Sequence, residues 1–121
     1  SCRLCNQTHR MKNAAIAFLL CAISAVTSAQ SVENGRQLFE QKKYPEARKQ
    51  LLNVKEGQKD FAAAQYYLGR IAFLEKNFED ALEYFEEATE ANENIADYQE
   101  WLGNAAGSVA RSANVFRQGM L

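Results

Sequence analysis

Residues 67–88, YLGRIAFLEKNFEDALEYFEEA, contain the pattern that decides the fold. Gly69 in this stretch lies midway between Gly35 and Gly103, at equal steps along the chain. The same step relates other pairs of identical or similar residues, which are Arg36 and Arg70, Phe39 and Phe73, Tyr44 and Phe78, Ala47 and Ala81, Leu51 and Phe85, Tyr67 and Trp101, and Leu68 and Leu102. A sequence period of this length is typical of stacked helical hairpins.

Outward from this stretch, apolar residues recur at the three-to-four spacing of helices that bury one face. The pattern predicts helices at about 31–42, 45–54, 61–75, 78–92 and 95–106. Ser31 and Asn77 are expected to cap the first and fourth of these helices, and Pro45 suits the first turn of the second. Gly107 and Ser108 interrupt the pattern, so we expect 107–121 to be an irregular segment with at most a weak helical turn.

The hairpins resemble the tetratricopeptide repeat family, whose signature has Leu-Gly in one helix and Ala-x3-Phe in the next. Units are expected at about 28–61, 62–95 and 96–121, with the last one incomplete. The residues that carry the resemblance are Gly35, Ala47 and Leu51, then Leu68, Gly69, Ala81, Phe85 and Ala88, then Leu102 and Gly103. The second unit departs from the signature at Gln65, Ala72 and Glu93, where Trp, Tyr and Pro are common.

The resemblance implies an all-α fold of antiparallel hairpins, stacked as a short solenoid of about 2.5 repeats over residues 30–106. The small residues let the two helices of one hairpin approach closely, and Phe85 with Ala88 packs each hairpin against the next. Because such a solenoid needs about three repeats, we expect a fragment of a longer protein. We also expect marginal stability, or self-association through the incomplete third repeat.

In this family the first helix of each hairpin lines a concave groove that holds a peptide or a partner helix. By resemblance, the groove residues here are Val32, Arg36, Phe39, Glu40, Tyr66, Arg70, Phe73 and Leu74, with Glu100 and Asn104 from the fifth helix. The two arginines would grip acidic groups or carbonyls, and Phe39 and Phe73 would be apolar anchors. In the alternative interpretation, the aromatic residues belong to the core between repeats and the arginines are solvated.

Residues 1–29 form a separate segment. Met11, Lys12 and Asn13 precede an apolar run at 14–26, and small residues follow at 27–29. This order is typical of a secretory signal peptide, and the run is shorter than the roughly 20 residues of a membrane span. We therefore expect a signal peptide at 11–29 and export of bacterial type to the periplasm or the exterior. Residues 1–10 would then lie upstream of the natural product.

Cys2, Cys5 and His9 have a spacing found in zinc sites, but a structural zinc site needs a fourth ligand. The chain has no other His, and its third Cys, Cys21, lies in the apolar run. We therefore expect no metal and no other cofactor. From about Gln30 onward there is no Cys, no His, no Gly-rich phosphate loop and no nucleophile motif, so no catalytic residues and no enzymatic activity are expected.

Charge argues against a nucleic-acid partner. The formal net charge is −1, from 14 bases and 15 acids. Three of the bases precede residue 30, which leaves 11 bases against all 15 acids in the remainder, the opposite of a basic binding surface. Acids without a base fill the fourth helix, which is typical of a solvated outer face; contact with a basic partner, or head to tail with another copy, is the alternative.

These observations predict an exported, non-enzymatic scaffold that binds a protein or peptide in the cell envelope, with no membrane span after signal cleavage. The alternative is the N-terminal repeat arm of a longer envelope enzyme, for example a peptidase, whose catalytic part follows Leu121.

Overall fold

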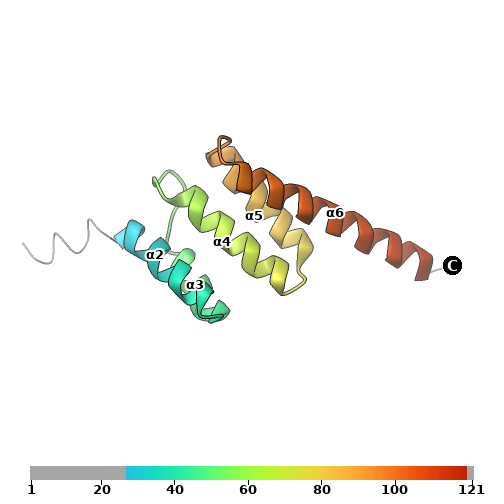
Figure 1. Cartoon of the computed structure of the whole chain (residues 1–121), viewed down its shortest axis with the longest axis horizontal. Helices are drawn as coiled ribbons and strands as arrows, with labels where there is room; N and C mark the ends of the chain where they lie inside the picture. The colour runs from blue at the N-terminus through green and yellow to red at the C-terminus, as the bar shows by residue number, and fades with distance from the viewer. Residues whose placement is uncertain (1–26, 120–121) are drawn as a thin grey trace, which may run out of the picture.

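The computed structural model describes residues 27–119, which form five α-helices and no strand (Figure 1). The helices are α2 (Thr27–Glu40), α3 (Tyr44–Leu51), α4 (Phe61–Leu74), α5 (Phe78–Ala91) and α6 (Ala96–Gly119). The expectations for residues 1–10, for the signal peptide up to residue 26, and for Cys2, Cys5, His9 and Cys21 lie outside the described residues. Residues 27–29, expected to end the signal peptide, belong to the first turn of α2.

The helices form two antiparallel hairpins, α2–α3 and α4–α5, followed by α6 alongside α5 (Figure 1). The predicted all-α fold of stacked hairpins is confirmed. Helix α4 is the central element, since it lies next to each of the other four helices.

The two hairpin turns share one backbone geometry, one repeat apart. Lys42 and Lys76 follow the first helix of each hairpin with φ of 62° and 63°. Their N–H groups donate to the carbonyls of Phe39 and Phe73, both at 3.0 Å. The N–H groups of the residues that follow, Lys43 and Asn77, donate to the carbonyls of Leu38 and Ala72, both at 2.9 Å. This pair of bonds is the Schellman motif, which ends a helix and reverses the chain. The sequence period therefore reaches down to the backbone of the turns.

Only glycine fits sterically where the two helices of each hairpin cross. A Cβ built on Gly35 would lie 2.6 Å from Cδ2 of Leu51, and one on Gly69 would lie 2.7 Å from Cε1 of Phe85. Leu51 and Phe85 are fully buried, so neither side chain has room to move away. The packing role expected for Gly103 is wrong, because a Cβ there would meet nothing within 4 Å. No described second helix completes the third hairpin over it.

This contrast gives a test with a matched control. Gly69→Ala is expected to lower the free energy of unfolding by about 1–3 kcal/mol, the usual cost of overpacking a core. Gly103→Ala, at the same repeat position in an exposed helix, is expected to raise it by about 0.5–1 kcal/mol, because alanine loses less backbone entropy. Urea titration followed by circular dichroism measures both. Equal effects at the two positions would contradict the packing described above.

The core is built from side chains of every described helix. One cluster of buried residues joins the first hairpin to α4, and a second joins α4, α5 and α6 through Ala72, Ala81, Phe85 and Ala105. A third cluster holds Tyr98 of α6 against Ala62 and Ala88. The stack is therefore continuous from α2 to α6.

Helix α6 differs from the sequence prediction. The break expected at Gly107 and Ser108, with an irregular segment after it, is wrong, because α6 runs through both as one 24-residue helix. Ser108 is buried and its Oγ donates to the carbonyl of Asn104 at 2.9 Å, so the hydroxyl is satisfied inside the helix. A glycine in a helix costs only about 1 kcal/mol relative to alanine, and the alanines around it favour the helix.

The two predicted caps have opposite outcomes. Asn77 caps α5 as predicted, since its side-chain oxygen accepts a hydrogen bond from the N–H of Asp80 at 3.5 Å. Ser31 is not a cap, because α2 begins earlier in the chain, at Thr27, and Ser31 lies inside the helix.

Candidate functional site

Arg70 lies among three aromatic rings that come from three different helices. Its guanidinium carbon is 4.8 Å from the ring centroid of Phe39 in α2, 5.6 Å from that of Tyr66 in α4 and 4.9 Å from that of Trp101 in α6. All three distances lie within the range of cation–π attraction. We call these four residues the Arg70 cluster. It lies where the first helices of successive repeats meet.

The polar contacts of Arg70 are incomplete. One terminal nitrogen donates to the Tyr66 hydroxyl at 3.5 Å, while the buried Nε has no hydrogen-bond partner. Among the described residues, no carboxylate lies within ion-pair distance of Arg70. Arg70 is only partly exposed, so its charge is held by rings rather than by an acid. A guanidinium in this state retains its capacity for a bidentate bond to a carboxylate.

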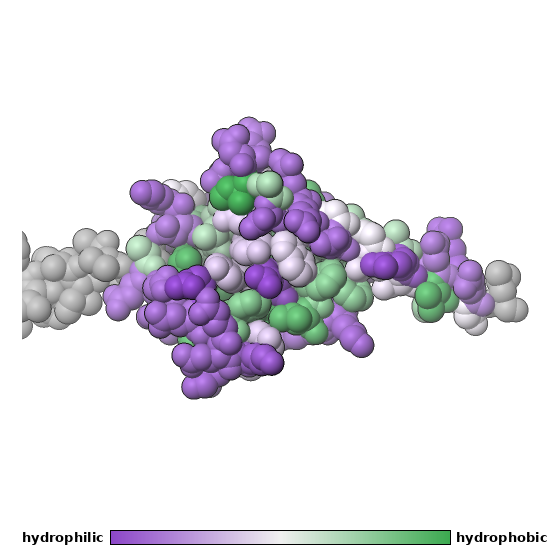
Figure 2. Space-filling view, in the orientation of Figure 1, coloured by the Kyte–Doolittle hydropathy of each residue, from purple (hydrophilic) through white to green (hydrophobic). Residues whose placement is uncertain are grey.

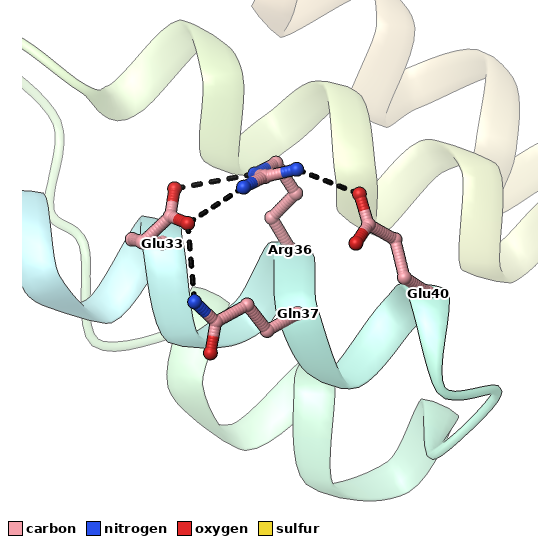
Figure 3. A network of polar contacts seen from close by, with 4 residues as sticks. All are labelled: Glu33, Arg36, Gln37 and Glu40. Atoms are coloured by element: carbon pink, nitrogen blue, oxygen red, sulfur yellow. Dashed lines mark hydrogen bonds and ion pairs between the residues drawn. The ribbon is translucent and has the colours of Figure 1, made fainter.

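Arg36, one repeat earlier, is in a different state (Figure 3). It pairs with Glu33 and with Glu40, both at 2.6 Å, and Gln37 donates to the same Glu33 at 3.2 Å. The hydrogen bond between Arg36 and Glu33 lowers the pKa of the Glu33 carboxyl and raises the pKa of the Arg36 guanidinium. With two acids of its own helix around it, Arg36 offers little free charge to a partner. The structure therefore does not place the two arginines in equivalent roles.

The other predicted groove residues are divided between core and surface. Phe39 contacts the rings of Tyr44 and Tyr67, and Tyr66 contacts that of Tyr98 at 4.9 Å. Phe73 stacks edge-on against Phe78 and Trp101. These aromatic side chains therefore contribute to packing between repeats, as the alternative interpretation held. Leu74 is 52% exposed at the end of α4, and Glu100 and Asn104 are exposed on α6.

Burial also affects two tyrosines next to the cluster. It raises the pKa of Tyr67, against the opposing effect of Arg36, and it raises the pKa of Tyr98. Both phenols therefore remain neutral near pH 7. They supply rings and hydroxyls to this region, but no charge.

Trp101 is the member of the cluster that was not among the groove residues predicted from the sequence. A signal for it was present, because Trp101 stands one repeat after Tyr67, which itself contacts Phe39. What the sequence does not show is that the ring turns toward Arg70.

A pocket in the described region lies away from the Arg70 cluster. It has a volume of about 700 Å³ and is bounded by the connector at 56–59, Phe61, and residues 87, 90 and 91 of α5. Burial raises the pKa of Glu87 in its wall. Across residues 27–119, no group of three or more His, Cys, Asp and Glu side chains is placed to hold a metal ion.

The fold and the Arg70 cluster define a helical-repeat module. The family model for the tetratricopeptide repeat matches residues 32–94 and 76–118. The chain belongs to the tetratricopeptide repeat family, whose repeats generally mediate protein–protein interaction. No curated protein and no solved structure matches the chain significantly. Within the described part of the chain, no helix has the length and apolar character needed to cross a membrane.

Proposed function

We propose that the chain binds an acidic segment of a protein or peptide partner at the Arg70 cluster. The observation that carries this proposal is a guanidinium that three rings hold in place and that no carboxylate of the described chain neutralises. A partner carboxylate supplies the missing charge, and its second oxygen accepts another N–H of the same planar group.

The cluster also favours binding through preorganisation. The rings of α2, α4 and α6 fix the guanidinium before a partner arrives, so less side-chain entropy is lost on binding. Arginine beside aromatic rings is also the composition in which interface hot spots are enriched. Exposed Leu74, four residues after Arg70 in α4, and exposed Asn104, three residues after Trp101 in α6, extend the surface.

We propose further that the module works outside the cytoplasm, as a scaffold of the cell envelope. The support is the order of a basic start, an apolar run and small residues at 11–29. N-terminal sequencing of the secreted protein tests this, with a start near Gln30 as the expected result. A mature protein that retains residue 14 would contradict it.

Binding is tested with an array of short synthetic peptides, each made with Asp and Glu and again with the neutral isosteres Asn and Gln. We expect the acidic forms to bind more tightly. Arg70→Met, which keeps much of the length of the side chain and removes its charge, is expected to weaken their binding by roughly 10–100-fold, because a hydrogen bond to a charged group contributes about 1.5–3 kcal/mol.

Arg36→Met is the matched control. It removes the same group one repeat earlier, where Glu33 and Glu40 already neutralise it, so binding should change less than threefold. The melting temperature of each variant shows whether the fold is retained. Equal losses for the two variants, or equal affinity for acidic and neutral peptides, would exclude Arg70 as the binding group.

A further inference from the structure

Helix α6 projects beyond the α4–α5 hairpin that covers its first half (Figure 1). It has 24 residues, whereas α4 and α5 have 14 each. Tyr98 and Ala105 are buried against the hairpin, and Val109, Ser112 and Phe116 continue the same stripe at helical spacing. Phe116 is 70% exposed. The apolar stripe of α6 thus continues past the end of the α4–α5 hairpin, and its second half is not covered by another described helix.

Open space surrounds the projecting ring. Phe116 borders a pocket of about 470 Å³ between α6 and the α4–α5 turn, with Phe78, Val109 and Ala113 also in its wall. It borders a second hollow of about 390 Å³ with Val115, which is 69% exposed. Figure 2 shows a hydrophobic patch among hydrophilic residues toward the free end of α6. The same surface therefore has an apolar projection and an apolar hollow.

The order of residues on this stripe is complementary to itself. Large residues, Val109 and Phe116, stand at the two ends, and small ones, Ser112 and Ala113, lie between them. In an antiparallel pair of such helices centred between 112 and 113, each Phe116 faces Val109 of the other copy. The small residues meet at the centre, where they allow the backbones to approach. This is the self-complementary contact that a twofold axis requires.

We propose that α6 pairs with α6 of a second copy of this chain, antiparallel, with Phe116 of each copy in the pocket beside Phe78 and Val109 of the other. We call this contact the α6 pair. It shares no residue with the Arg70 cluster and does not depend on the proposed function.

Charge on the rim agrees with a second copy as the occupant. Lys76 and Glu79 both lie in the wall of the pocket, and Arg117 is exposed next to Phe116 on the projecting half of α6. Antiparallel pairing carries Arg117 toward Glu79 of the other copy. The stripe is only about two helical turns long, so the pair buries less surface area than a standard stable interface. The pair should therefore dissociate on dilution.

Site-specific cross-linking tests the geometry in the full chain. Cys2, Cys5 and Cys21 are first replaced with Ser, and Ala113→Cys is then introduced at the expected axis. Under mild oxidation we expect a disulfide-linked dimer, because the two new thiols meet across the pair. Asn114→Cys is the matched control, since it is adjacent and exposed but points away from the stripe on the helix surface. We expect at least tenfold less dimer from it.

Phe116→Asp is then added to the Ala113→Cys protein. It should reduce cross-linking at least tenfold, because the pair would lose the Phe116 ring and would place a charge against Phe78 and Val109 of the other copy. Residues 113, 114 and 116 are exposed, so their substitution should retain the fold, and circular dichroism checks this. Equal cross-linking at 113 and 114 would show that association occurs through another segment, such as the apolar run at 14–26. That result would overturn the proposal. So would a dimer that persists in the Phe116→Asp variant, or a chain that remains monomeric and is not cross-linked.

Discussion

Replacing Phe85 with alanine is expected to lower the free energy of unfolding by about 3–5 kcal/mol, the usual cost of removing a buried phenylalanine ring. Phe85 is 0% exposed, and its ring centroid lies 5.9 Å from that of Trp101 and 6.2 Å from that of Tyr66. Its loss leaves a cavity where α4, α5 and α6 meet. Since small domains are stable by only about 5–15 kcal/mol, urea titration should show a large shift of the midpoint.

The same cavity should reverse the effect of a second substitution. Gly69→Ala is destabilising in the natural sequence because its Cβ meets the Phe85 ring. In the Phe85→Ala background that ring is gone, so Gly69→Ala is expected to stabilise by about 0.5–1 kcal/mol through helix propensity. A four-member mutant cycle measures the coupling. If Gly69→Ala has the same sign in both backgrounds, the packing of Phe85 against Gly69 is not what limits this position.

Leu51→Ala is expected to cost about 2–5 kcal/mol, whereas Leu52→Ala, the next residue, should cost less than about 1 kcal/mol. Leu51 is 0% exposed and fills the space over Gly35, while Leu52 is 49% exposed. The pair keeps residue type and position in the chain almost constant and differs chiefly in burial. Chemical denaturation with two probes, circular dichroism and tryptophan fluorescence, measures the effect.

The two probes make this comparison more specific. Trp101 reports on α6 and circular dichroism reports on all helices, so unfolding confined to the first hairpin would separate the two curves. Similar costs for Leu51→Ala and Leu52→Ala would contradict the difference in burial between these two residues.

The sequence period predicted the fold because each repeat holds small and large residues at fixed offsets. Gly35 and Gly69 meet Leu51 and Phe85, which follow them at the same offset in the two repeats. The same offset from Gly103 reaches Gly119, which has no side chain to fill the space. The structure has α6 continue there as one helix. The tendency of Gly107 and Ser108 to end a helix was outweighed by the helix propensity of the residues around them and by the burial of Ser108.

The candidate site was only partly predictable. The period makes Arg36 and Arg70 equivalent, and the structure separates them because Glu33 and Glu40 flank Arg36 at helical spacing. That difference can be read in the sequence from residues three and four positions away. Tyr66 can be read in the same way, four positions before Arg70, but the rings of Phe39 and Trp101 cannot, since they come from other helices and meet Arg70 only when the repeats stack.

The central position of α4 has a consequence for how the molecule opens. Beyond their own hairpin, the backbones of α2 and α3 lie next to α4 and next to neither α5 nor α6. In a repeat stack of this kind, an end hairpin is able to open while its neighbours remain folded. Arg70 loses the ring of Phe39 whenever α2 leaves. A partner that needs the complete set of rings therefore binds only the closed form, and its binding is thermodynamically linked to closure of the first hairpin.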